Sequence, residues 1–431
     1  MTAQRYDLIV VGSGAAGMSA ALTAHELGLK VVILEKAPWF GGSTAYSGGA
    51  TWIPNNPQQV AAGAEEPEEH ALAYLRAEIG NHGNEDMWKA FLRSGPEMLR
   101  FMSERTHLQF TMRPVAPDYH PEQPGGALGY RVLDPVDFDG RKLGRWLHRL
   151  RPPIQEFTIL GGMMLGRTDL PHMFRLTRSP ASAWHGLKIV ARHIGDLIMH
   201  RRATRLTLGS AMAGRLAASV FERGIPLRLE TEASELITRE GRVCGVRALG
   251  PEGEIELFAD KGVVLATGGV PRSKELNDTL RPHADTLGHW SMSPEHNTGD
   301  GARLAGQAGA AMAKDNAEPL LYAPVSLLPQ RDGSVRPFPH LFLDRAKPGI
   351  IAIDSTGRRF VNEASSYHDF VLALLGRGRG RAPNGPAWLL ADHRAIRRYG
   401  LGAVRPAPAP LGGHLKSGYL VRGRSVYELA G

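Results

Sequence analysis

Cysteine is almost absent from the sequence, with Cys244 the only one among 431 residues. A single cysteine excludes a disulfide framework and a cysteine-based zinc site, and it is typical of proteins in a reducing cytoplasm. We expect Cys244 to be a small residue packed in a strand. Long apolar runs are missing too, because charges interrupt every stretch before the roughly 18 apolar residues that a membrane span needs. The N-terminus runs directly into an apolar strand without a signal-peptide pattern. These absences predict a cytoplasmic protein.

Metal-binding patterns are also lacking. Residues 134–144 (DPVDFDGRKLG) resemble a calcium loop only superficially, because the carboxylates are misplaced and position twelve is Arg145. His283, His289 and His296 do not have the i, i+4 spacing of a zinc helix. We therefore expect no metal ion.

Basic residues exceed acidic ones, and the net charge is +8. They are scattered, however, and their densest cluster, GRGRGR at 376–381, has no interleaved aromatic residues. We expect this cluster to be an exposed loop, and we expect no nucleic acid partner.

A second basic segment, residues 183–202, has the periodicity of an amphipathic helix. Its apolar residues recur at helical spacing beside basic ones: Leu187, Val190, Ile194, Leu197 and Ile198, with Lys188, Arg192 and Arg201. Such a helix either packs against the body of its own protein or lies on a membrane surface. We expect packing, with peripheral membrane contact as the alternative.

The N-terminal segment predicts a βαβ unit, with strands at 8–11 and 31–34 and a helix at about 15–28. Between the first strand and the helix, Gly12, Gly14 and Gly17 form the spacing G-x-G-x-x-G. This loop brings backbone amides and a helix N-terminus to a pyrophosphate. The predicted dinucleotide-binding residues are Gly12, Ser13, Gly14, Ala15, Ala16, Gly17, Glu35 and Lys36, with Glu35 placed to accept hydrogen bonds from a ribose.

A second glycine-rich cluster follows at 36–52 and contains Gly41 and Gly42. It resembles the flavin-binding segment of the superfamily of fumarate reductases and 3-ketosteroid Δ1-dehydrogenases. The resemblance implies FAD as the cofactor. It also implies contacts along the ribityl chain and the isoalloxazine ring for Ser43, Thr44, Ser47, Gly48 and Gly49.

Later segments continue the resemblance. Residues 224–249 predict two strands joined by a turn at Glu240–Gly241, and 261–270 predict a buried strand that ends in a glycine turn. In the superfamily, residues that match Glu232 and Ala233 cover the adenine, and the element that matches Ala266, Thr267 and Gly268 returns the chain to the FAD domain. Asp300 precedes an alanine-rich helix, where it either caps the helix or lies beside the flavin.

The resemblance implies an α/β fold with two domains. A Rossmann-like, glutathione-reductase-type FAD-binding domain is expected at 1–315, with a largely helical insertion at about 56–205. An inserted α+β catalytic cap domain is expected at 316–431. In the superfamily a closing segment follows the cap and completes the FAD domain. No such motif follows Tyr367, so we expect the cap to be incomplete and the C-terminal closing segment to be missing.

The segment RRFVNEASSYHDF (358–370) carries the candidate chemistry. Fumarate reductases have a proton-donating arginine after a similar element, whereas 3-ketosteroid Δ1-dehydrogenases resemble N-E-x-x-x-Y with a tyrosine base. The resemblance implies Tyr367 as the catalytic base, with Tyr119, from PDYHPEQPGG, assisting it. Tyr322, in an apolar stretch at 317–329, is a rival base. A phenol has a pKa of about 10, so such a base needs activation at neutral pH.

Together these features predict an FAD-dependent dehydrogenase that desaturates a C–C bond next to a ketone. The proton would go to Tyr367 and the hydride to flavin N5. The expected partners are a small apolar, steroid-like ketone and an external electron acceptor. Two alternatives stay open: a fumarate-reductase-like enzyme that reduces an activated alkene, and a truncated, inactive FAD-binding remnant.

Overall fold

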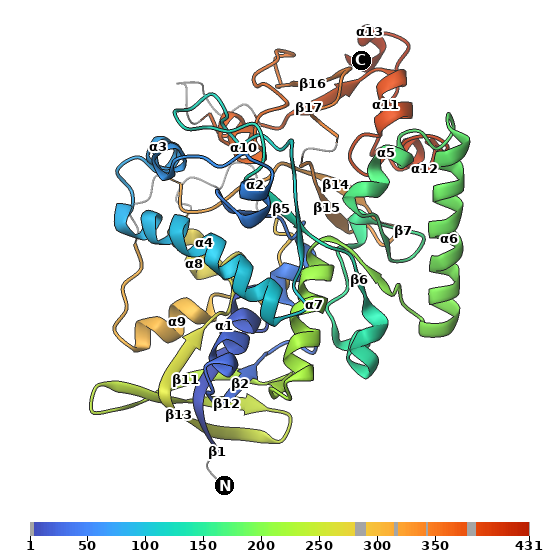
Figure 1. The fold of residues 1–431 in the computed structure, drawn as a ribbon. Helices are drawn as coiled ribbons and strands as arrows, with labels where there is room; N and C mark the ends of the chain where they lie inside the picture. The colour runs from blue at the N-terminus through green and yellow to red at the C-terminus, as the bar shows by residue number, and fades with distance from the viewer. Residues whose placement is uncertain (1–3, 281–289, 314–317, 342–343, 377–384, 431) are drawn as a thin grey trace. The chain divides into compact units, whose positions relative to one another are not determined.

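The computed structural model describes residues 4–280, 290–313, 318–341, 344–376 and 385–430 (Figure 1). His283, His289 and most of the basic segment 376–381 lie outside these residues. The chain forms two compact units, which are described separately. Unit 1 comprises 1–167, 191–277 and 293–316, and unit 2 comprises 168–190, 278–292 and 317–431. The domain boundary expected after residue 315 stays a prediction.

Unit 1 is built on a six-stranded sheet with the order β10-β2-β1-β13-β12-β11. The first four strands in this order are parallel, and β12 and β11 continue the sheet as an antiparallel hairpin. The strands are β1 (Gln4–Val11), β2 (Val31–Leu34), β10 (Leu227–Arg228), β11 (Glu232–Arg239), β12 (Arg242–Gly250) and β13 (Gly253–Leu265). The predicted hairpin with its turn at Glu240–Gly241 is confirmed, and Cys244 lies in β12. The end of β13 was expected to be buried, but residues 262–265 are only half-buried.

The central strands are buried on both faces, because successive side chains of a strand point to opposite sides. Val10 and Ile33 belong to one apolar cluster, and Ile9 and Val32 belong to another. Helices α1 (Ala15–Glu26) and α7 (Leu208–Glu222) contribute to the first cluster. The second cluster contains residues of the β11–β12 hairpin and of α9 (Asp300–Gln307). The predicted βαβ unit is thus confirmed, with β2 at its predicted residues and α1 ending at Glu26.

The insertion at 56–205 combines helices with short strands. Its helices are α2 (Pro57–Ala61), α3 (Glu68–Ile79), α4 (Glu85–Arg105), α5 (Leu170–Met173) and α6 (Pro180–His200). Its strands are β4 (Phe110–Met112), β5 (Val132–Pro135), β6 (Phe138–Asp139), β7 (Thr158–Ile159), β8 (Met163–Met164) and β9 (Arg205–Leu206). The insertion also contains the 3-10 segments η2 (Gly140–Arg149), which is kinked at Gly144, η3 (Gln155–Phe157) and η4 (Arg167–Asp169). Outside the insertion lie β3 (Thr51–Trp52), η1 (Gly42–Tyr46) and α8 (Lys274–Leu280).

Unit 2 carries two small antiparallel strand pairs and several short helices. The strands are β14 (Val325–Pro329) with β15 (Val335–Pro339), and β16 (Ile350–Ile353) with β17 (Trp388–Ala391). The helices are α10 (Tyr367–Leu374), α11 (His393–Tyr399), α12 (Gly412–Lys416) and α13 (Val426–Ala430). Ile350, Ala395 and Leu401 form a small core cluster. This packing holds β16 and α11 together.

Helix α6 confirms the helix predicted at 183–202, but only part of its packing. Of the five apolar residues expected to pack, Val190 and Leu197 are half-buried, whereas Leu187, Ile194 and Ile198 are exposed. The inward side of α6 also carries the buried polar residues Ser182 and His193. In the described part of the chain, no helix combines the length and the apolar character needed to cross a membrane.

Candidate cofactor and active site

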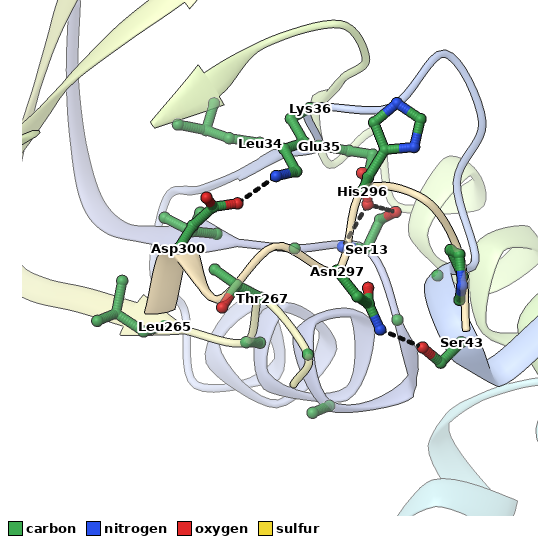
Figure 2. Close-up of a pocket in the computed structure, with 18 of the residues that line it drawn as sticks. Ser13, Leu34, Glu35, Lys36, Ser43, Leu265, Thr267, His296, Asn297 and Asp300 are labelled. Carbon is green, nitrogen blue, oxygen red and sulfur yellow. Dashed lines mark hydrogen bonds and ion pairs between the residues drawn. The ribbon is translucent and has the colours of Figure 1, made fainter. Parts of the chain in front are cut away.

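A pocket of unit 1 lies at the carboxyl ends of three neighbouring parallel strands. Val11 of β1 is paired in register with Leu34 of β2 on one side and with Leu265 of β13 on the other. All three residues line a cavity of about 370 Å³ (Figure 2). Ligands of open α/β sheets bind at this edge, where the chain leaves the central strand in opposite directions.

The glycine loop after β1 is shaped by close backbone contacts. Gly12 has a φ of +108°, and a Cβ there would lie 2.2 Å from the carbonyl oxygen of Ala266. A Cβ on Gly17 would lie 1.9 Å from the carbonyl oxygen of Gly12. Beside Gly14, in contrast, the nearest atom to such a Cβ is Thr44 Oγ1 at 3.5 Å. The loop is therefore tight at its ends and open at Gly14, where it starts α1 and lines the pocket.

Glu35 joins the loop to the end of β2. One carboxylate oxygen accepts hydrogen bonds from the Ser13 hydroxyl (2.6 Å) and the Ser13 amide (3.2 Å), and the other accepts one from the Ala37 amide (2.9 Å). Glu35 is buried but lines the pocket. Because a carboxylate offers about four acceptor sites, these contacts leave capacity for ribose hydroxyl groups.

Lys36 and Asp300 form an ion pair across the pocket, as Figure 2 shows. The Lys36 ammonium also donates to Thr298 Oγ1 at 2.6 Å. The capping role considered for Asp300 is wrong: Gly299 is the N-cap of α9, and the side chain of Asp300, the first residue of the helix, pairs with Lys36. Asp300 therefore lies at the pocket, as the other interpretation held.

A loop before α9 supplies two further polar residues. Asn297 Nδ2 donates to the Ser43 hydroxyl at 2.7 Å, which connects this loop to η1 (Figure 2). His296 is partly buried, and this burial, together with the charges of Arg151 and Lys36, lowers the pKa of its imidazole. Neutral His296 therefore leaves Arg151 and Lys36 as the cations of the pocket at neutral pH.

Arg151 is the least expected residue of the pocket. Its side chain is only 4% exposed, and its guanidinium lies over the rings of Trp39 and Tyr46, at 5.5 and 5.7 Å from their centroids. Its Nε is buried and has no hydrogen-bond partner among the described residues. A buried guanidinium is costly unless an anion compensates it. The donor set of this pocket thus fits an anionic ligand such as a pyrophosphate.

The pocket brings together most of the predicted cofactor-binding residues. Those that line it are Gly12, Ser13, Gly14, Ala15, Ala16, Glu35, Lys36, Gly42, Ser43, Thr44, Ala233, Ala266, Thr267, Gly268 and Asp300. Those that do not are Gly17, Gly41, Ser47, Gly48 and Gly49. Thr44 Oγ1 accepts a hydrogen bond from the Ala15 amide at 2.9 Å and so fixes the start of α1. Ser47 and Gly49 lie against the start of α7, where the Ser47 carbonyl accepts from the Gly209 amide.

Sequence reasoning missed Arg151, Thr231, Pro294, His296 and Asn297, which also line the pocket. His296 was singled out only as a residue that binds no metal. Of the five, Asn297 opens the glycine-rich stretch that also contains Asp300, and this was the one local signal. Arg151 follows several arginines and precedes two prolines. This pattern does not indicate that its side chain binds a ligand, so the sequence alone could not place it in the pocket.

The segment that carries Tyr367 is fixed by buried charges in unit 2. Arg345 has no exposed surface and donates to the carbonyl oxygens of Glu363 and Ser365, the latter at 2.8 Å. The Glu363 carboxylate accepts from the Ala352 amide at 2.7 Å and pairs with Arg359. Ser366 then caps α10 by accepting from the Asp369 amide at 3.1 Å. Half-buried Tyr367 is the first residue of that helix.

Tyr322, the rival base, lies close to the same helix start. Its ring stacks on His368 with a centroid separation of 5.5 Å and an interplanar angle of 4°. The Tyr322 amide donates to His368 Nδ1 at 3.2 Å. Both candidate bases therefore flank the N-terminus of α10.

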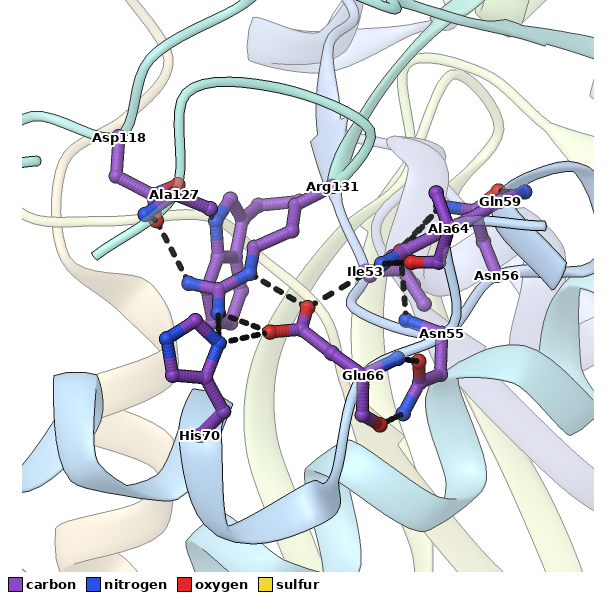
Figure 3. A network of polar contacts seen from close by, with 11 residues as sticks. Ile53, Asn55, Asn56, Gln59, Ala64, Glu66, His70, Asp118, Ala127 and Arg131 are labelled. Atoms are coloured by element: carbon purple, nitrogen blue, oxygen red, sulfur yellow. Dashed lines mark hydrogen bonds and ion pairs between the residues drawn. The ribbon is translucent and has the colours of Figure 1, made fainter. Parts of the chain in front are cut away.

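Tyr119 lies in unit 1, and its neighbours form a buried polar network (Figure 3). Arg131, which has no exposed side-chain surface, pairs with Asp118 at 2.7 Å and with Glu66. Asp118 also accepts from the Ala127 amide at 2.9 Å. The backbone at residue 118 is thus anchored, while Tyr119 itself is 50% exposed.

The network also changes the acidity of its members. Burial alone would raise the pKa of Glu66, but hydrogen bonds from Arg131 and His70 outweigh it, so the pKa lies below its ordinary value. Burial raises the pKa of Tyr74 to about 12. Tyr119 and Tyr367 belong to different units, and their pairing in catalysis remains a proposal.

A glycine loop, an acidic residue after β2 and a basic pocket at the strand ends define a dinucleotide-binding α/β protein. The sequence matches the FAD binding domain family over residues 7–423. The chain therefore belongs to this FAD-binding family. It is an FAD-dependent oxidoreductase of the class that includes the dehydrogenases described next.

Two curated relatives are similar over almost the whole chain. The 4-oxocyclohex-2-ene-1-carboxylate 5-dehydrogenase of Sinomonas cyclohexanicum is 36% identical over 98% of this chain and 71% of its own length. The 3-oxosteroid 1-dehydrogenase of Mycolicibacterium smegmatis is 34% identical over 100% of this chain and 75% of its own length.

Among solved structures, the 3-ketosteroid Δ1-dehydrogenase of Sterolibacterium denitrificans in complex with 1,4-androstadiene-3,17-dione is similar, with a TM-score of 0.80 and 33% identity. The match covers 95% of this chain and 73% of that one. A flavocytochrome c3 fumarate reductase in an open conformation has a TM-score of 0.56 and 18% identity, over 96% of this chain and 62% of that one. The second likeness is one of fold alone.

Proposed function

We propose that the protein is a dehydrogenase that desaturates a C–C bond next to the ketone of a small apolar, steroid-like or cyclic substrate. The observation that carries this proposal is a tyrosine at the start of α10, Tyr367, where a carboxylate-reducing enzyme would carry an arginine. The names of relatives that are 34–36% identical support the same class of reaction. An apolar ketone has no carboxylate group, so its binding does not require an arginine that pairs with a negative charge.

FAD, when bound, supplies the hydride acceptor of such a reaction. The remaining task belongs to the chain: a base must remove the proton from the carbon next to the ketone. We assign that proton to the phenolate oxygen of Tyr367. The buried contacts of Arg345 and Glu363 fix the backbone before α10 and thus orient the phenol. Tyr119 would assist by donating a hydrogen bond that stabilises the phenolate.

The residues proposed to hold FAD follow from the pocket. Gly14 leaves space beside the start of α1, where amides and the helix dipole favour a phosphate. Arg151 supplies the compensating cation for the pyrophosphate. Glu35 would accept from the adenosine ribose, and Ala233 would cover the adenine.

Two further features are part of the proposal. An external electron acceptor would reoxidise the cofactor after each desaturation. The single free cysteine, Cys244, is consistent with a cytoplasmic location.

Tyr367→Phe tests the catalytic base, with Tyr322→Phe as the matched control. Each variant would be assayed with a 3-ketosteroid and with 4-oxocyclohexanecarboxylate, using an artificial electron acceptor. We expect Tyr367→Phe to lower kcat by about 10²–10⁴-fold, the usual contribution of a general base, with an unchanged flavin spectrum. A large loss in Tyr322→Phe alone would transfer the role to Tyr322. Turnover of small dicarboxylates instead of ketones would overturn the proposal.

Arg151→Met tests the pyrophosphate contact, and Arg149→Met is its control because Arg149 is half exposed and does not line the pocket. We expect Arg151→Met to weaken binding of both FAD and ADP at least tenfold, measured by titration of the apoprotein. Equal affinities in the two variants would exclude the contact.

A further inference from the structure

The outward face of α6 presents a continuous apolar stripe to solvent. Trp184, Leu187, Ala191, Ile194 and Ile198 alternate at spacings of three and four residues, which places them on one side of the helix. The four larger side chains are 60%, 57%, 51% and 77% exposed, respectively, and Ala191 is exposed as well. Because α6 is one unbroken helix, the stripe follows from the helical repeat alone.

The opposite side of α6 is fixed to the protein. His193 and Ser182 are each only 3% exposed. His193 Nε2 donates to the Leu160 carbonyl at 2.9 Å, and Ser182 Oγ is 3.2 Å from His172 Nδ1. Half-buried Ile189, Val190 and Leu197 lie on this same side. The helix therefore has its own apolar contacts inward, and the apolar stripe on its outward side is additional to them. Large exposed apolar patches mark interaction sites in proteins that fold on their own.

The charged side chains on the outward side of α6 are all positive. Lys188 and Arg192 are exposed beside the stripe, and the Lys188 ammonium lies 5.9 Å from the centroid of the Trp184 ring. Asp196 is the one acidic residue within α6. Its carboxylate accepts from the Thr204 amide and hydroxyl at 2.9 Å each, which directs it away from the stripe.

We infer that this face of α6 binds the surface of an anionic lipid bilayer. An apolar stripe flanked by cations and a tryptophan matches the boundary between acyl chains and anionic headgroups. Helices of this kind lie in the plane of the interface rather than cross it. The chain's net charge of +8 acts in the same direction.

A second copy of the chain is a poorer occupant. Pairing two such faces would bring Lys188 and Arg192 of one copy near those of the other, with no acidic residue on the stripe to pair with them. Coiled-coil partners normally set opposite charges beside the apolar seam. The bilayer supplies that opposite charge. This inference does not depend on the proposed reaction.

Co-sedimentation of the FAD-loaded protein with sucrose-loaded vesicles tests the inference. Vesicles of phosphatidylcholine alone would be compared with vesicles that contain one quarter phosphatidylglycerol. We expect binding to the anionic vesicles, at least tenfold weaker binding for the double variant Ile194→Glu/Ile198→Glu, and a reduced preference for anionic lipid in Lys188→Gln/Arg192→Gln. Met87→Glu is the control, because Met87 is an apolar residue of a different helix, α4, and is 67% exposed.

A second readout protects the test against misfolding of a variant. Tryptophan emission should shift to the blue when anionic vesicles are added to the unmodified protein, and this shift should be lost in Trp184→Phe. Flavin content and turnover should stay unchanged in all four variants. Equal sedimentation of the unmodified protein and of Ile194→Glu/Ile198→Glu would overturn the inference. A dimer in light scattering that the same variant dissociates, without vesicle binding, would assign the face to a second copy.

Discussion

Arg131 is a guanidinium without exposed side-chain surface, and two carboxylates surround it. The Arg131→Met variant would leave Glu66 and Asp118 partly buried without their counter-charge. Breaking a buried ion pair from one side costs about 3–5 kcal/mol, so we expect a loss of this size in the free energy of unfolding. Urea denaturation followed by circular dichroism measures it.

Arg93→Met is the control for this prediction. Arg93 pairs with Glu68 at 3.0 Å, but both side chains are exposed, and exposed pairs contribute little to stability. Similar unfolding curves for the two variants would mean that the buried network contributes no more than a surface pair.

Glu66 predicts how stability depends on pH. Its pKa is lowered in the folded protein from an ordinary value of 4.5, so the unfolded chain binds the proton more readily. Its contribution to stability is therefore fully present above about pH 4.5 and is lost as the pH falls through the lower, folded value. Glu66→Gln should reduce the slope of the unfolding free energy in this acidic range. An unchanged slope, measured by urea unfolding at several pH values, would contradict the assignment.

The residues that sequence reasoning missed share one property: distant chain segments bring them to the pocket. Arg151 reaches it from the insertion, and Asn297 and His296 reach it from the loop before α9. Arg151 has no periodic or glycine-rich context, and Asn297 begins a glycine-rich stretch (297–310) in which only Asp300 was singled out. Gly12, Gly14 and Glu35 were predictable because the turn, the helix start and the strand end lie within one short stretch of sequence.

The turn between β1 and α1 is the element on which the pocket depends. Gly12→Ala would combine a strained φ of +108° with a Cβ placed 2.2 Å from the Ala266 carbonyl oxygen. Gly28→Ala is the matched control, because its φ is +81° and no atom lies within 4 Å of the added Cβ. Strain of this kind costs about 1–3 kcal/mol.

We expect Gly28→Ala to lose no more than that strain and to keep its FAD. Gly12→Ala should be less stable than Gly28→Ala and should be purified with little flavin, because relief of the clash displaces the loop from β13. Thermal unfolding and the ratio of flavin to protein absorbance measure both effects. Full flavin content in Gly12→Ala would show that the loop tolerates a side chain.

Elements were predictable where local pattern and burial agree. The strands of the βαβ unit are apolar on both faces, and the glycines after the first strand favour a tight turn. The bounds of β2 were therefore predicted, as was the end of β1, although β1 begins at Gln4 rather than at residue 8. Helix α6 was predicted as a helix because its period is 3.6. Its packing was predicted only in part, because apolar residues occur on both sides of α6 and their spacing does not tell which side the protein covers. The role of Asp300 was also not decided by the local sequence. Asp is a common N-cap residue, but in the structure Gly299, in a left-handed conformation, is the N-cap of α9.

At the scale of the whole molecule, the cofactor should govern stability. FAD that binds the folded chain alone stabilises it by about 2.7 kcal/mol when its concentration is 100 times its Kd. Removal of FAD should therefore lower the melting temperature, and added FAD should restore it in a concentration-dependent way. ADP should restore part of the shift, because Arg151 and Gly14 lie where the pyrophosphate is proposed to bind. Calorimetry of the apoprotein with riboflavin, which lacks the pyrophosphate, is the control. A melting temperature that FAD leaves unchanged would contradict the assignment of the pocket.

The strands β1, β2 and β13 end in register, and this affects which parts of the sequence can change during evolution without loss of the cofactor site. Most of the pocket wall comes from short pieces of chain directly after these strands, at 11–16, 34–36 and 265–268. The sequence between Lys36 and Leu265 contributes fewer residues to the pocket wall than these three pieces do. Ser43, Thr44, Arg151 and Ala233 belong to that sequence and line the pocket. Changes elsewhere in it can therefore alter other surfaces of the protein while the nucleotide-binding residues are kept.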